Sequence, residues 1–112
     1  MTHTDDHTAR VRELNDRFRQ ALGEGDRYMT AGIAALPFLD QAAILRTVMA
    51  FDAFTPDNDP HGEHDFGSFD HKGRKIFWKI DYYDPSLECG SEDPADPVQT
   101  QRVLTIMLAE EY

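Results

Sequence analysis

The sequence lacks most of the features that stabilise or anchor a protein from outside its own core. Its single cysteine, Cys89, excludes an internal disulfide, and no apolar run is long enough to span a membrane. No secretory signal or internal repeat is visible. These absences predict a cytoplasmic protein with no membrane attachment, folded around its own hydrophobic core.

Positive charge is also scarce. The 112 residues include 11 Lys and Arg against 21 Asp and Glu, which gives a formal charge of −10. Such a field repels phosphate backbones and anionic lipids, so we expect no direct binding to nucleic acid or to a membrane surface. The same field attracts cations and basic protein surfaces.

Apolar residues, in contrast, are plentiful enough for one globular core. They make up 40% of the chain and include seven Phe, four Tyr and one Trp. Residues 1–8 lack apolar periodicity and are predicted to form a flexible N-terminus. Residues 9–112 are predicted to form a single domain.

Two helices are predicted in the first half of that domain. The first follows Ala9, and its apolar residues recur at helical spacing: Val11, Leu14, Phe18 and Leu22. The arginines among them are interpreted as a solvent-exposed face: Arg10, Arg12, Arg17 and Arg19. A short strand is expected near Tyr28–Gly32, and a second helix over Leu39–Phe54.

The second half predicts a hairpin followed by a helix. Asp70–Gly73 is typical of a turn, and the alternation after it directs one set of side chains to the core: Ile76, Trp78, Ile80 and Tyr82. Asp96 and Pro97 match the start of a third helix that runs through the apolar C-terminal segment. The expected fold class is therefore α+β, a small antiparallel sheet of a central hairpin and a short third strand, packed against about three helices.

Two acidic segments stand out because neither contains Lys or Arg. We call Asp57–Asp65 the first acidic loop and Glu88–Asp96 the second acidic loop. Helix caps and turns do not account for so many carboxylates, and concentrated like charge is easier to understand on a surface that meets something cationic. The predicted partner-binding residues are Asp57, Asp59, Glu63, Asp65, Glu88, Glu92 and Asp93.

The first acidic loop also admits a different chemistry. His61 and His64 are three residues apart, and Asp65 could complete a mixed nitrogen and oxygen shell for a transition metal. This alternative predicts a metal-assisted enzyme or a metal-binding module. Metal-free acid–base catalysis by Asp65 or Glu63 with His64 requires a pocket that the sequence does not reveal, so no catalytic residue and no cofactor are predicted.

Three strings resemble one family. They are "FTPDNDPHGEHDFG" at residues 54–67, "FWKIDYYD" at 77–84 and "GSEDPADPVQTQRVLTIMLAEEY" at 90–112. They are similar to the uncharacterised bacterial family called domain of unknown function 3768. His61 stands where the family pattern leads us to expect tyrosine, which weakens its case as a ligand. The resemblance implies no activity, cofactor or catalytic residue.

The resemblance also implies small bacterial proteins found near mobile genetic elements. By analogy, such elements encode acidic proteins that block host restriction or CRISPR machinery. We therefore expect an interaction protein rather than an enzyme, one that inhibits a partner by occupying its basic, nucleic-acid-binding surface as a nucleic-acid mimic. The metal-based alternative and simple self-association through the C-terminal segment both stay open.

Overall fold

The computed structural model describes residues 3–23 and 27–112. Its elements are α1 (His3–Gln20), β1 (Arg27–Met29), α2 (Ala31–Ala34), α3 (Phe38–Ala50), β2 (Phe66–His71), β3 (Arg74–Tyr83), β4 (Gln101–Leu108) and the 3₁₀ helix η2 (Ala109–Glu111). Within these ranges no helix is both long enough and apolar enough to cross a membrane.

The strands form one sheet in the order β1-β4-β3-β2. β3 pairs antiparallel with both β2 and β4, whereas β1 pairs in parallel with β4. The predicted α+β class is confirmed. The sheet is mixed because the short strand β1 runs parallel to its neighbour at one edge.

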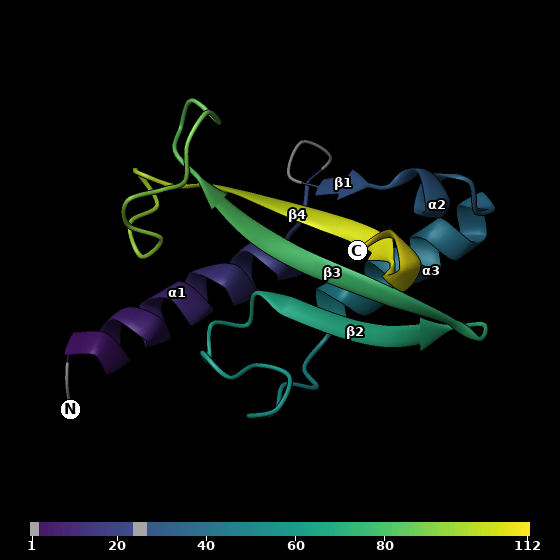
Figure 1. Cartoon of the computed structure of the whole chain (residues 1–112), viewed down its shortest axis with the longest axis horizontal. Coiled ribbons are helices and arrows are strands. Elements are labelled where there is room, and N and C mark those ends of the chain that lie inside the picture. Colours follow the sequence, from purple (N-terminus) through teal and green to yellow (C-terminus); the bar gives the residue numbers. More distant parts are fainter. Residues whose placement is uncertain (1–2, 24–26) are drawn as a thin grey trace.

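The helices α1 and α3 lie behind the sheet in Figure 1, against one of its faces. Ile76, Trp78 and Ile80 of β3 are buried on that face, as the alternation predicted. Their register partners on β4 are Leu108, Ile106 and Leu104, which are buried as well. Ile33 of α2 and two residues of α3 complete this core, namely Ile44 and Val48.

The predicted hairpin is confirmed. The turn between β2 and β3 places both Lys72 and Gly73 at positive φ, at 50° and 83°. Two consecutive positive φ angles fit the twist of the flanking strands, and glycine adopts the second without strain. This turn fixes the register that sends Trp78 into the core.

The prediction of a C-terminal helix is wrong. The segment forms the strand β4, and Asp96 stabilises a turn by accepting a hydrogen bond from the backbone N–H of Val98 at 2.9 Å. β4 lies between β1 and β3 in the sheet, and its residues are buried on both faces, Leu104 and Ile106 on one and Met107 on the other. A strand buried on both faces has a dense apolar sequence that also fits a buried helix.

The helix boundaries also differ from the predictions. α1 begins at His3 and not after residue 8, and His7 Nε2 lies 3.0 Å from Asp93 Oδ1 in the second acidic loop. α3 ends at Ala50 because Phe51 adopts an extended backbone, with φ −60° and ψ 131°. The expected strand is confined to β1, since the residues that follow Thr30 begin α2.

Candidate functional site

The first acidic loop is folded by its own polar side chains. The backbone N–H of Thr55 donates to Asn58 Oδ1 at 2.9 Å, and the amide of Asn58 donates to the carbonyl of Ala53 at 2.9 Å. The backbone N–H of Asp59 donates to the carbonyl of Thr55 at 2.8 Å. Asn side chains stabilise turns in this way, and the loop is thereby held in one shape over α1.

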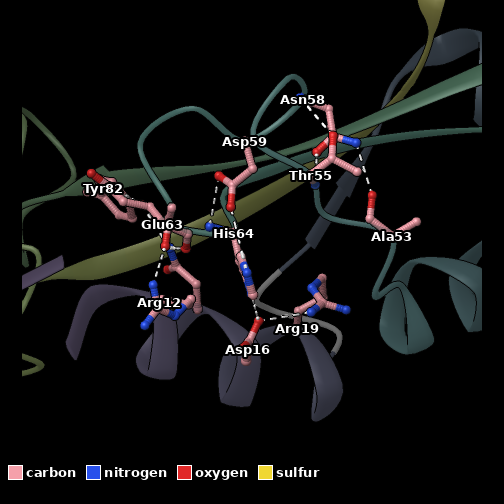
Figure 2. Close-up of polar contacts among 12 residues, drawn as sticks. Arg12, Asp16, Arg19, Ala53, Thr55, Asn58, Asp59, Glu63, His64 and Tyr82 are labelled. Atoms are coloured by element: carbon pink, nitrogen blue, oxygen red, sulfur yellow. Dashed lines mark hydrogen bonds and ion pairs between the residues drawn. The ribbon is translucent and has the colours of Figure 1, made fainter. Parts of the chain in front are cut away.

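His64 connects this loop to α1, as Figure 2 shows. Its Nδ1 lies 2.9 Å from Asp16 Oδ1, and its Nε2 lies 3.6 Å from Asp59 Oδ2. The imidazole stacks on Phe54 with ring centroids 3.7 Å apart and planes 4° apart. The backbone of His64 has φ 56°, a left-handed conformation that non-glycine residues adopt at a cost and that is frequent in functional sites.

Asp16 is itself fixed by a buried arginine. Arg19 is 1% exposed, and its Nη2 donates to Asp16 Oδ1 at 3.1 Å. Its Nη1 donates to the carbonyl of Val48 at 3.0 Å, and its guanidinium carbon lies 5.2 Å from the centroid of Trp78. A buried guanidinium held by these contacts has little freedom to move, so it keeps the Asp16 carboxylate in place.

A cavity of about 540 Å³ lies between α1 and the loop. Arg12, Asp59, His61 and His64 are among its lining residues. Arg12 Nη1 donates to the carbonyl of Gly62 at 3.0 Å, which positions the guanidinium at the wall of the cavity. The volume lies within the range of small-molecule sites in proteins.

A second polar cluster links both acidic loops to α1. Asn15 is fully buried, and its amide donates to the carbonyl of Glu63 at 2.9 Å and to the Tyr82 hydroxyl at 2.8 Å. Arg102 Nε donates to Asn15 Oδ1 at 2.7 Å, while its Nη2 donates to the carbonyl of Pro94 in the second acidic loop. The Tyr82 hydroxyl donates to Glu63 Oε1 at 2.8 Å, and burial raises the pKa of Tyr82 above its ordinary value.

The comparisons with known proteins place this fold in a family. A family model described as "Protein of unknown function (DUF3768)" matches residues 29–111. The chain belongs to the DUF3768 family. No curated protein and no solved structure matches the chain significantly.

In this DUF3768 protein the predicted partner-binding residues divide into two groups. Three of them have exposed side chains, namely Asp57, Glu88 and Glu92. The other four are partly buried and make contacts inside the molecule, or line a cavity: Asp59, Glu63, Asp65 and Asp93. Burial, together with the charge of Glu63, raises the pKa of Asp65.

The three candidate metal ligands do not converge. His64 faces Asp16, whereas Asp65 lines a separate cavity of about 370 Å³. His61 lies on the wall of both cavities. Across residues 3–23 and 27–112, no group of three or more His, Cys, Asp or Glu side chains is arranged to hold a metal ion.

The residues that α1 contributes to the site differ from the sequence-based expectation. The interpretation of Arg12 and Arg19 as part of a solvent-exposed face is wrong, since Arg12 lines the cavity and Arg19 is buried. Asn15 and Asp16 were not singled out at all. A signal was present, because Val11, Asn15 and Arg19 follow one another at four-residue spacing and therefore share one face of the helix.

Proposed function

We propose that this protein binds a basic surface of a partner protein through the exposed carboxylates of its two acidic loops. The observation that carries the proposal is the exposure of the Asp57, Glu88 and Glu92 side chains. All three are exposed, and within the described part of the chain no cation pairs with their carboxylates. Their charge is therefore available to a partner.

Several positive charges, in contrast, already have partners within the same chain. Lys72 Nζ lies 2.8 Å from Asp40 Oδ1, and Lys79 Nζ lies 2.9 Å from Asp81 Oδ2. Arg19 and Arg102 are buried. None of these four cations is paired with Asp57, Glu88 or Glu92, so the charge of those carboxylates stays available to a cationic surface.

The topology places the two loops at one end of the sheet. β2 begins where the first acidic loop ends, and the second acidic loop connects the end of β3 to the start of β4. Both loops contact α1, through His64 and Asp93 respectively. Figure 1 shows the two loops at the same end of the molecule, on different sides of α1.

We assign the partner to the class of proteins whose basic groove otherwise holds nucleic acid. Carboxylates spaced along a surface present a charge pattern that arginine and lysine side chains recognise in phosphates. The protein would then act as an inhibitor by occupying the groove, in the cytoplasm of a bacterium. This part of the proposal rests on the analogy with small acidic inhibitors of host defence.

Affinity capture from the native host with matched charge variants tests the proposal. E88K/E92K reverses two exposed loop carboxylates, and D70K/E110K reverses two exposed carboxylates at the opposite end of the sheet. Each variant changes the formal charge by the same amount, from −10 to −6, because each Lys replaces one acid. We expect the first variant to lower the association rate with the captured protein about tenfold and the second to leave it nearly unchanged.

The salt dependence completes the test. Binding in about 0.1 M salt should be lost in about 1 M salt, where the Debye length falls from ~10 Å to ~3 Å. Equal association rates for the two variants, or capture that does not respond to salt, would contradict a role for the loop carboxylates.

A further inference from the structure

The imidazole ring of His64 is held in place by neighbouring side chains on one side, and its other side faces a cavity. Nδ1 is 2.9 Å from Asp16 Oδ1, and Phe54 covers the face of the imidazole. His64 also lines the cavity of about 540 Å³ between α1 and the first acidic loop. Its side chain is 24% exposed, which is enough for contact with a ligand.

The contact with Asp16 determines which nitrogen can act as a base. In the neutral imidazole, a proton on Nδ1 donates to the carboxylate, and Nε2 then carries the lone pair. This arrangement of carboxylate and imidazole is the one that hydrolytic enzymes use to orient a general base. Asp16 cannot turn away easily, because Arg19 also binds its Oδ1 at 3.1 Å.

The surroundings of Nε2 suit a water molecule. Asp59 Oδ2 lies 3.6 Å from Nε2, which is longer than a hydrogen bond. A water in the cavity could donate one proton to each of these atoms while its own lone pairs point away from them. The Asp59 carboxylate is only 6% exposed, and the backbone N–H of His64 donates to its other oxygen at 3.3 Å.

Arg12 limits the class of substrate. Its guanidinium lines the same cavity and is positioned by the carbonyl of Gly62. One guanidinium balances one negative charge, while the neighbouring Asp59 carboxylate repels a dianion. The overall charge of −10 disfavours a polyanion such as DNA or RNA. A small phosphodiester with a single negative charge fits these conditions.

We propose that this cavity is a metal-independent hydrolytic site for small phosphodiesters, in which His64 is the general base and Asp16 is its positioning residue. Water forms a bond to phosphorus as its proton passes to His64 Nε2. The ester P–O bond opposite the attacking oxygen breaks, the leaving oxygen takes a proton from solvent, and the imidazolium releases its proton to solvent. The products are a phosphate monoester and an alcohol, and the imidazole is neutral again.

The first test uses bis(p-nitrophenyl) phosphate as substrate, with EDTA present. We expect turnover that H64N lowers by about 100-fold or more, the usual range for loss of a general base. Asparagine is chosen because it tolerates the left-handed backbone at this position. The matched control is H71N. His71 Nε2 also lies 2.9 Å from a carboxylate oxygen, that of Asp40, but His71 is at the end of β2 far from the cavity. H71N should retain full turnover.

Two further variants separate orientation from binding. D16N should lower kcat at least about tenfold with little change in KM, because it alters the orientation and tautomer of His64. R12K should mainly raise KM, because lysine does not reproduce the planar guanidinium. If Asp16 had a purely structural role, D16N would change the stability of the protein and not the pH profile of kcat. Thermal unfolding and the pH profile are therefore measured for each variant.

A measurement on the unmodified protein does not depend on the folding of any variant. Nitrogen-15 spectra should show the neutral His64 ring protonated on Nδ1, and titration with dimethyl phosphate should shift the signals of His64 and Arg12. Several outcomes would overturn the proposal: no turnover of the substrate above the buffer rate with EDTA present, turnover retained in H64N, or a neutral His64 ring protonated on Nε2. None of these results depends on whether the acidic loops bind a partner.

Discussion

Trp78 is a large core side chain that is packed closely on several sides. It is fully buried, and its ring contacts Phe51 and Phe54 edge to face at 5.5 and 6.1 Å between centroids. Gly67 lies opposite Trp78 in the register of β2 and β3. A Cβ on Gly67 would lie 2.4 Å from Trp78 Nε1, closer than two unbonded atoms can approach.

We therefore predict that G67A destabilises the fold by about 1–3 kcal/mol, the usual cost of overpacking a core. Phe51 and Phe54 contact the indole on other sides, which limits how far it can move away. The control is G90A, since the nearest atom to a Cβ on Gly90 is a backbone oxygen at 3.8 Å. Urea unfolding should place G90A within about 0.5 kcal/mol of the parent. Equal stability of the two variants would show that Trp78 is not fixed.

At the scale of elements, η2 closes the end of the sheet through one carboxylate. Glu111 Oε1 accepts hydrogen bonds from Thr30 Oγ1 at 2.6 Å and from the backbone N–H of Leu108 at 2.9 Å. Its Oε2 accepts one from the backbone N–H of Gly32 at 2.9 Å. The hydrogen bond from Thr30, followed by those from the backbone, lowers the pKa of Glu111 below 4.5.

Because the pKa of Glu111 is lowered in the folded state, the hydrogen bonds to its carboxylate stabilise the fold at pH values above the ordinary pKa of 4.5. This stabilisation is lost as the pH falls. We predict that E111Q has a lower urea midpoint than the parent at pH 7. The difference should narrow progressively below pH 4.5. E110Q is the control, because Glu110 is exposed and its carboxylate makes a single long ion pair within the described residues, at 3.4 Å from Arg74. A difference for E111Q that does not vary with pH would contradict this assignment.

The sequence predicted elements with clear periodicity better than elements that are buried on both sides. The hairpin followed from a turn with Gly73 and from the alternation through Ile76 and Trp78, and both features were confirmed. β4 was mistaken for a helix because it has buried apolar residues on both of its faces. Alternation is lost in such a strand, and only its short length and its β-branched residues distinguish it from a helix.

The site was predictable only on its loop side. His64 was singled out because histidines and carboxylates cluster in the first acidic loop. Its principal partner, Asp16, lies 48 residues away in sequence, and nothing in either segment specifies their pairing. Asn15 and Arg19 belong to the buried face of α1. Polar residues in an amphipathic helix are ordinarily assigned to its solvent-exposed face, so sequence reasoning does not place these two in the core.

At the scale of the whole molecule, the net charge opposes folding. The molecule measures 44 × 32 × 23 Å, so at about 0.01 M salt the Debye length of ~30 Å exceeds its shortest dimension. Carboxylates on opposite sides then repel one another. The ion pairs that salt would weaken are mostly exposed, and exposed pairs contribute little to stability.

We therefore predict that added salt stabilises the protein. Raising sodium chloride from about 0.01 to about 0.15 M should increase Tm by roughly 4–8 °C, which corresponds to ~1 kcal/mol for a domain of about this size. E88K/E92K, with a formal charge of −6 in place of −10, should be more stable than the parent at low salt and should respond less to added salt. Differential scanning calorimetry measures both effects. A Tm that falls as salt is added would mean that ion pairs such as Lys72 with Asp40, at 2.8 Å, outweigh the repulsion among the loop carboxylates.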